Sequence, residues 1–476
     1  MTPADQPLRP RRPLTRLMAL LTTAALAAAG APAPAPAQTA KPKGPPIIRD
    51  AEIEQLLREY TQPILQVAGL AKQNVQVVII NDRAFNAFVA DGRRIFINAG
   101  TLMEAMTPNE VIGVLAHETG HIAGGHLSRL REQVAQATTQ SIVALLLGVG
   151  AMVAASRSGG ASGSAGQAGM AALQAPQAMI QSSLLAYVRT QEDAADRAGV
   201  KFLTATGQSA KGMHDSFKRL ADRIFYQNRY IDPYMQSHPM PAERVHALEE
   251  MARSSPYWDK KDSQALQQRH DLMRAKLYGF IDTPEAVFRR YLPSDNSLPA
   301  RYARAIASYR FANAAGALAQ IEALIQAQPQ NAYFQELKGQ ALLEAGKPAE
   351  AIAPLRRAVA LAPNAALIQI MLAQALIASG DRARGDEAVT LLEAALRREP
   401  ESPEAYTQIA MAYGRKGDLA HADLASAQAA FLRGELQTAR QLAARAKTRF
   451  PVGSPGWVKA DDIATYRPPQ RSLLPN

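Results

Sequence analysis

The pattern H-E-x-x-H from His117 to His121 constrains this chain more than any other feature. Apolar residues at helical spacing, among them Leu115 and Ile122, place the pattern on a predicted helix. Two histidines four residues apart project from one face of a helix, so both can bind the same metal ion. Glu118 is then placed to take a proton from zinc-bound water rather than to bind the metal itself. The pattern predicts zinc-dependent hydrolysis, although it also occurs by chance in unrelated helices.

A catalytic zinc needs three protein ligands and one open position, so another ligand must lie elsewhere in the chain. His126 is one candidate, but a continuing helix would place it on a different face from His121, which favours a structural or supporting role. Glu192 and Asp196 lie four residues apart on a later predicted helix. Glu192 can bind zinc, and Asp196 can accept the free N–H of a ligand histidine and fix its tautomer. A solvated acidic helix face explains this pair alone, but not its combination with His117 and His121.

The two motifs together, H-E-x-x-H and then E-x-x-A-D, resemble those of the gluzincin superfamily of CAAX prenyl proteases and HtpX. The segment from Asn86 to Gly100 is similar to the N-A-F segment and hairpin that precede the zinc helix in that superfamily. Ser237 to Arg244 resembles its late H-P-x-x-x-x-R element. Repeats follow the catalytic domain, as in the BepA branch. The resemblance covers roughly residues 47–450, and Val188, where many members have serine, leaves the zinc ligands untouched.

The resemblance implies roles for residues that no spacing assigns. His238 would reach the zinc site, either to stabilise the oxyanion of the tetrahedral intermediate or to occupy the open zinc position and hold the enzyme idle. Arg244 would orient a carboxylate or the substrate carbonyl. An edge strand near the metal would bind an extended substrate backbone, with a purely structural hairpin as the alternative. We assign that substrate-binding strand to Arg94, Ile95, Phe96, Ile97 and Asn98.

The N-terminus has the composition of a cleavable signal peptide, with a disordered Ala/Pro-rich tail as the alternative. Arginines up to Arg16 precede an apolar run from Leu17 to Ala29, and an A-x-A site ends at Ala37. The run is too short to span a bilayer comfortably. The chain has no cysteine, so a zinc ion must be held by histidine and carboxylate. The predicted signal peptide, together with the resemblance, predicts export to the bacterial periplasm.

The predicted fold is α+β and mostly helical: a zincin-type catalytic domain with a small β-sheet, followed by an all-α tetratricopeptide (TPR) solenoid. Asp50 can cap the first helix of the catalytic domain. The β-branched run Asn74–Ile80 predicts a strand, and Phe85–Val89 and Arg94–Asn98 predict two further strands joined by a turn at Asp91-Gly92. The predicted segments are a signal peptide (1–37), a linker (38–46), the metallopeptidase domain (47–275), a connecting helix or linker (276–296), the repeat domain (297–450) and an irregular, Pro-rich tail (451–476).

The C-terminal half repeats with the period of tetratricopeptide units. Gly339, Ala351, Ala358 and Pro363 stand at the expected positions of a 34-residue unit that begins at Ala332. Similar units precede and follow it, with a generic Ala-rich helical bundle as the alternative. Stacked units form a solenoid whose concave face binds protein segments. The repeats are therefore predicted to bind protein substrates or partners.

Residues 142–185 have an unusual composition that allows two interpretations. Ile142–Ala155 is continuously apolar, and Ser156–Gly169 is rich in glycine, serine and alanine. The segment can form a buried helix (Ile142–Ala155) and a flexible loop (Ser156–Gly169) that make a lid near the zinc cleft, or an amphipathic hairpin that makes peripheral contact with a membrane. Glycine and serine favour the lid because they supply flexibility.

The chain is basic, but it has no basic stripe interleaved with aromatic residues. The net charge of +11 suits attraction to anionic lipid headgroups or acidic partners, and no nucleic-acid motif is present, so nucleic-acid binding is not predicted. We expect a periplasmic endopeptidase with one zinc ion per chain that hydrolyses misfolded or stalled outer-membrane proteins. The rival interpretations are a chaperone or scaffold with latent or minor proteolysis, and a peripheral membrane protease.

Overall fold

The computed structural model of the chain describes residues 46–136, 163–226, 238–239, 241–311 and 314–468. Ile47–Asn476 forms one compact unit, to which the following description applies. The predicted signal peptide and nearly all of the predicted linker lie outside the described residues and stay predictions.

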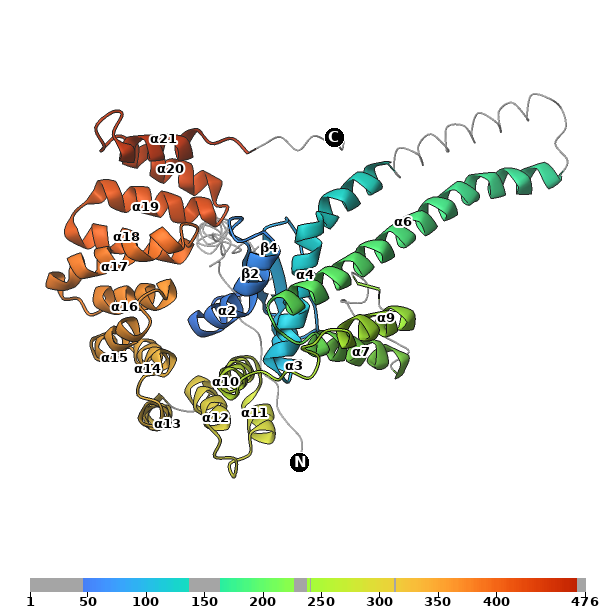
Figure 1. Cartoon of the computed structure of the whole chain (residues 1–476). Coiled ribbons are helices and arrows are strands. Elements are labelled where there is room, and N and C mark those ends of the chain that lie inside the picture. Colours follow the sequence, from blue (N-terminus) through green and yellow to red (C-terminus); the bar gives the residue numbers. More distant parts are fainter. Residues whose placement is uncertain (1–45, 137–162, 227–237, 240, 312–313, 469–476) are drawn as a thin grey trace, which may run out of the picture. The chain divides into compact units, whose positions relative to one another are not determined.

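A four-stranded sheet carries the N-terminal part of this unit (Figure 1). Its order is β1 (Ile47–Ile48), β2 (Gln76–Ile80), β4 (Arg94–Asn98) and β3 (Ala87–Val89). β2 and β4 are parallel, whereas β1 with β2 and β3 with β4 are antiparallel. The three predicted strands are confirmed, with later starts for two of them. β1 was not predicted, because two residues show no recognisable alternation.

The prediction that Arg94–Asn98 is an edge strand is wrong, and substrate binding by these residues stays a prediction. β4 is hydrogen-bonded along one side to β2 and along the other to β3, so its backbone groups are already paired. The free edge beside it belongs to Ala87–Val89 in β3. β4 pairs in parallel with β2, although β3 lies between them in the chain, and no local sequence pattern encodes this pairing.

Three helices pack against the sheet, namely α2 (Ala51–Val67), α3 (Ala99–Glu104) and α4 (Pro108–Gly124). Asp50 caps α2 as predicted, because its side chain accepts a hydrogen bond from the backbone N–H of Ile53. Their apolar faces and the inner face of the sheet form one core.

Helix α4 carries the H-E-x-x-H pattern, and both of its ends are well defined. Thr107 caps it by accepting from the backbone N–H of Glu110, and Pro108 occupies the first turn, where no N–H is needed. Gly125 ends the helix in the left-handed conformation, with φ of 63°. The histidines therefore stand in the last two turns of a helix that is fixed at both ends.

Helix α6 (Gly163–Ala205) is 43 residues long and packs beside α4 (Figure 1). It contradicts the later part of the loop predicted over Ser156–Gly169, because the chain is already helical from Gly163. Alanines among the glycines supply the helix propensity that the loop prediction neglected. Residues 137–162, with the apolar run Ile142–Ala155, lie outside the described residues. Within the described ranges, no helix is both long and apolar enough to cross a bilayer.

Helices α7 (Lys211–Tyr226) and α9 (Ala242–Arg253) complete the peptidase part, and α7 crosses α4 closely. A Cβ added at Gly113 would lie 2.6 Å from the backbone of Met213 in α7. We expect Gly113→Ala to lower the free energy of unfolding by about 1–3 kcal/mol, because the two helices must move apart. Denaturant unfolding measures this change.

Gly414→Ala is the matched control for that substitution. Gly414 is also helical, in α18, but a Cβ there would meet nothing within 4 Å. The control should raise the free energy of unfolding by about 0.5–1 kcal/mol through helix propensity. Equal effects of the two substitutions would show that the close crossing of α4 and α7 contributes nothing.

Helices α10 (Gln264–Ile281) and α11 (Pro284–Arg290) join the peptidase part to the repeats. The predicted boundary after residue 275 falls inside α10, which packs on α2 and α3 and also on the first repeat helix. Met273 and Leu277 belong to the peptidase core, whereas Leu272 and Ala275 belong to the core of the first repeats.

The repeats are antiparallel helix pairs stacked in chain order, which confirms the predicted solenoid (Figure 1). At the crossing of α14 and α15, a Cβ added at Gly339 would lie 2.3 Å from the side chain of Leu355, so a small residue is required there. The repeat helices are α12 (Leu298–Phe311), α13 (Ala314–Ala327), α14 (Ala332–Glu344), α15 (Pro348–Leu361), α16 (Ala366–Ala378), α17 (Gly385–Arg398), α18 (Pro403–Lys416), α19 (Leu419–Leu432) and α20 (Leu436–Lys447), with a short 3-10 turn η1 (Arg382–Arg384) before α17.

The prediction of an irregular tail over 451–476 is wrong for its first half. α21 (Pro455–Thr465) packs against α19 and α20, with Ala460 buried between them. Ser454 caps the helix, and Pro455 occupies its first turn. Proline at this position starts a helix, so the proline content was misread as irregular structure.

Candidate metal centre

Helix α4 presents two histidines one turn apart to the same space. His117 is fully buried, and the side chain of His121 is 12% exposed. Their Nε2 atoms lie 3.0 Å apart. Helix α6 brings Glu192 to the pair, with Oε2 3.4 Å from His117 Nε2 and Oε1 3.3 Å from His121 Nε2. The three residues predicted as metal ligands are therefore brought together.

The segment before α9 adds His238 to this group. Its Nδ1 lies 3.0 Å from Glu192 Oε2 and 3.3 Å from His117 Nε2. One ligand atom from each of His117, His121, Glu192 and His238 lies within 4.8 Å of all the others. In the part of the chain that the structure describes, this is the only group of histidines and acids so arranged.

Asp196 and Arg244 hold the ligands from behind, as the sequence and the resemblance implied. Asp196 Oδ1 lies 2.9 Å from His117 Nδ1 and can accept its N–H. Arg244 donates from Nε and Nη2 to the two oxygens of Asp196, at 2.6 and 2.9 Å, and its Nη1 lies 2.8 Å from Glu192 Oε2. This arrangement points the Nε2 of His117 toward the other ligands.

The ionisable groups of the site are strongly coupled. Burial lowers the pKa of His117, but its contacts with Asp196 and Glu192 outweigh this effect and raise the value to about 9. Burial, with the charge of His117, lowers the pKa of His121 well below its ordinary value. The pKa of Glu192 is lowered despite burial, because His238 and His117 stabilise the carboxylate. A carboxylate and imidazole rings are donor types that bind transition metals.

Glu118 has the surroundings expected of a proton acceptor. It is fully buried, and neither carboxylate oxygen has a hydrogen-bond partner. Burial raises its pKa, while His238 and His117 lower it. Unpaired buried carboxylate oxygens are rare in native proteins and typical of functional sites. The nitrogen and oxygen donors together with this acid fit a hydrolytic metal centre.

His126 lies outside the metal-binding group but touches it. Its Nδ1 is 3.0 Å from Nδ1 of His121. The left-handed Gly125 turns the chain back, so His126 supports His121 from the side. This is the supporting position that the sequence favoured.

Two features of the site were not predicted. Ala87 in the edge strand β3 accepts a hydrogen bond from His238 Nε2 at 3.2 Å, so the free edge reaches the metal centre where the assigned strand β4 does not. Phe217 of α7 packs edge-to-face on His117, with ring centroids 5.2 Å apart. Phe217 belongs to no motif, and only the apolar spacing of α7 could have drawn attention to it.

Comparison with known proteins gives matches to both halves of the chain. The model of peptidase family M48 matches residues 48–252, and the tetratricopeptide repeat model matches residues 302–366 and 370–422. The beta-barrel assembly-enhancing protease of Yersinia pestis is 24% identical over 86% of this chain and 82% of its own length.

Two further relatives match shorter parts of the chain. Metalloprotease LoiP of Escherichia coli (strain K12) is 30% identical over 39% of this chain and 68% of its own length. A protein of Vibrio cholerae, whose name also refers to a beta-barrel assembly-enhancing protease, is 28% identical over 44% of this chain. This match spans only 41% of the Vibrio cholerae protein.

Proposed function

This chain belongs to peptidase family M48 and is a metalloendopeptidase with tetratricopeptide repeats, and we propose that its metal is zinc and its substrates are proteins of the bacterial envelope. The observation that carries the proposal is the meeting of His117, His121 and Glu192 beside the buried carboxylate of Glu118, which has no hydrogen-bond partner and lies 3.5 Å from His238 Nε2. Two histidines, one carboxylate and an open position are the ligand set of hydrolytic zinc sites.

The residues of the centre divide the chemistry among them. Zinc would be held by His117, His121 and Glu192, and when bound it supplies a Lewis acid that acidifies water and polarises a carbonyl. Glu118 accepts the proton of the attacking water and delivers it to the leaving amine. Asp196, itself held by Arg244, fixes the tautomer of His117.

The free edge of β3 is the better candidate for substrate binding. An extended peptide can add to Ala87–Val89 as a further strand and so place its scissile bond over the metal ligands. His238 bonds to this edge at Ala87. Substrate pairing along β3 therefore requires His238 to move away.

This geometry favours an idle form in which His238 takes the fourth position around the metal. We expect His238→Ala to raise the rate of casein cleavage severalfold, because it opens both the metal position and the edge strand. A continuous assay with fluorescent casein at equal zinc content measures this rate. A large fall in rate with unchanged zinc would instead assign His238 to stabilisation of the oxyanion.

The substrate class is inferred from the relatives and from the predicted leader. Relatives named as beta-barrel assembly-enhancing proteases match most of the chain, which supports a role with misfolded or stalled outer-membrane proteins in the periplasm. The repeats would bind those substrates or partner proteins. A chaperone or scaffold with minor proteolysis is the second candidate, because the repeats make up about two fifths of the described residues.

Zinc content and casein cleavage, measured on protein without residues 1–37, test the proposal. One zinc ion per chain, activity lost with a chelator and activity restored by added zinc would support it. Bound zinc without cleavage, in the wild type and in His238→Ala alike, would favour the scaffold. A stoichiometric metal other than zinc would correct the choice of ion.

A further inference from the structure

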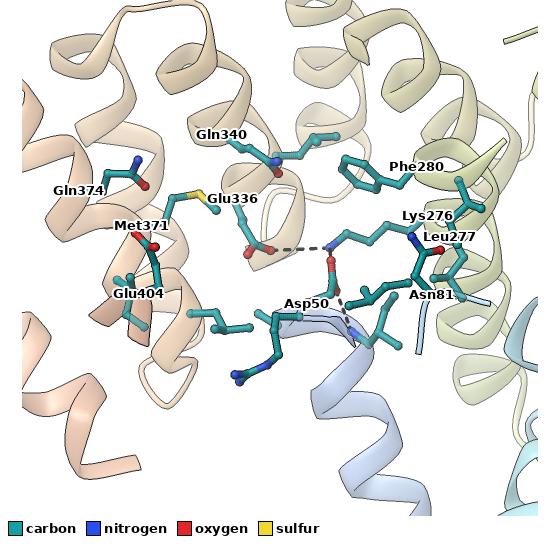
Figure 2. Close-up of a pocket in the computed structure, with 18 residues that line it drawn as sticks. Asp50, Asn81, Lys276, Leu277, Phe280, Glu336, Gln340, Met371, Gln374 and Glu404 are labelled. Carbon is teal, nitrogen blue, oxygen red and sulfur yellow. Dashed lines mark hydrogen bonds and ion pairs between the residues drawn. The ribbon is translucent and has the colours of Figure 1, made fainter. Parts of the chain in front are cut away.

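A second cavity lies far from the chemistry described so far, where the start of α2 and helix α10 meet the repeat helices α14 and α16 (Figure 2). Its volume is about 470 Å³. Pockets that bind small ligands or ligand side chains have volumes of roughly 300–1,000 Å³. None of the metal ligands lines it.

Most of the cavity wall is apolar. Leu277 and Phe280 of α10 form one side, and Met371 of α16 forms part of the other (Figure 2). Ile370 of α16 also lines the cavity. Such a wall can bury aliphatic side chains of a ligand. Polar groups stand between these apolar sides, and they determine which ligand fits.

The polar groups of the cavity contain more carboxylates than cations. Lys276 is buried, and its Nζ lies 2.8 Å from Asp50 Oδ2, 3.2 Å from Glu52 Oε2 and 3.8 Å from Glu336 Oε2. One ammonium group is therefore the shared cationic neighbour of three carboxylates. Arg49, at the rim, is already held by Glu54 at 2.7 Å and by the repeat residue Glu399 at 2.9 Å.

Of these three carboxylates, Glu336 lies farthest from the ammonium group of Lys276. It lines the cavity, is only 6% exposed, and its Oε2 has no hydrogen-bond partner. Burial raises its pKa to about 8, because Lys276 at the longer distance offsets the loss of solvent only in part. A buried acid without an adequate partner destabilises the protein, and a second cation would relieve this cost.

We propose that this cavity binds the lysine or arginine side chain of an extended protein segment whose apolar neighbours pack on Leu277, Phe280 and Met371. The cationic head would pair with Glu336, and its aliphatic stem would lie along the apolar wall. α14 and α16 belong to the repeats, so the inference rests on their proposed role in protein binding. The exposed Glu404 at the rim extends the same acidic character.

Direct binding tests this inference without any hydrolysis. The protein is the full chain without residues 1–37, carrying Glu118→Gln to prevent cleavage. The probes are two fluorescein-labelled peptides of leucine and serine that differ at one position, which holds lysine in one and norleucine in the other. Fluorescence anisotropy should show about tenfold tighter binding of the lysine peptide, because only that peptide pairs with Glu336.

Two further substitutions locate the site. Glu336→Gln should weaken the lysine peptide about tenfold and leave the norleucine peptide nearly unchanged. Gln374→Lys, at an exposed position of the lining, should also weaken the lysine peptide, because it brings a competing cation without disturbing the core. Glu350→Gln on α15, an exposed acid paired with Lys347, is the control and should change nothing.

The possible outcomes separate this inference from the proposed function. Equal binding of the two peptides, or a folded Glu336→Gln protein with unchanged affinity, would overturn the inference, and Gln374→Lys decides the matter if Glu336→Gln does not fold. Spermidine that competes as strongly as the peptide would make this a site for small polycations and overturn the protein segment. If the wild type cleaves casein but the Glu118→Gln protein does not bind the lysine peptide, only this inference is refuted. If the peptide binds but the wild type does not cleave casein, only the proposed peptidase function is refuted.

Discussion

Glu118→Gln should lower the rate of casein cleavage roughly 10³-fold, while the protein keeps its metal. Glutamine has nearly the same shape but cannot accept a proton from water. His117, His121 and Glu192 are unchanged, so the metal-binding group stays complete. The loss should therefore appear in kcat, with little change in KM or in metal content. Single-turnover cleavage and metal analysis on the same preparation measure both quantities.

Asp193→Asn provides the control for this change. Asp193 is an exposed acid next to Glu192 on α6, so the substitution removes a nearby charge without touching the centre. Its activity and metal content should match those of the wild type. If Glu118→Gln lost its metal, Glu118 would be a ligand and the assignment of roles would be wrong.

Arg244→Met should weaken both the fold and the metal site. Arg244 is buried and pairs with Asp196 and Glu192, so its removal leaves two buried carboxylates without their common cation. Breaking a buried ion pair from one side costs about 3–5 kcal/mol in the free energy of unfolding. Loss of the support behind metal ligands weakens metal affinity by about 10–100-fold. Denaturant unfolding with a chelator present and competition with a chromophoric chelator measure the two effects separately.

Arg253→Met, on the same helix, is the matched control. Arg253 is exposed, pairs with Glu249 one turn away at 2.8 Å, and lies over the ring of Trp258 at 4.7 Å. Surface pairs of this kind contribute about 0–1 kcal/mol, and this one is remote from the metal ligands. Similar losses in both variants would mean that α9 is merely sensitive to substitution, and the supporting role of Arg244 would be refuted.

The metal centre was largely predictable because its residues follow local rules. His117 with His121, and Glu192 with Asp196, are pairs four residues apart, and a helix places such pairs on one face whatever the tertiary fold. No such rule brings the two helices together, and for that step the family resemblance was needed. Phe217 remained invisible because its contact with His117 depends entirely on how α7 crosses α4.

The wrong predictions share a physical cause, since each depends on contacts distant in sequence or on context. The sequence of Arg94–Asn98 identified a strand but not its two neighbours. Composition suggested a loop at Gly163–Gly169 and an irregular tail at Pro455, yet both stretches are helical. The cavity beside Glu336 is lined by residues from α2, α10 and α14, which no single window of sequence contains.

Helix α10 limits how the peptidase part and the repeats can be exchanged independently during evolution. Two different faces of α10 belong to the two cores, and Tyr278 also bonds to the backbone of Met103, shortly before the metal-binding helix begins. A gene fusion at the apparent border would divide a helix that both neighbours need. The repeats and the peptidase part share α10, so transfer of the repeats alone would leave the peptidase core without Met273 and Leu277.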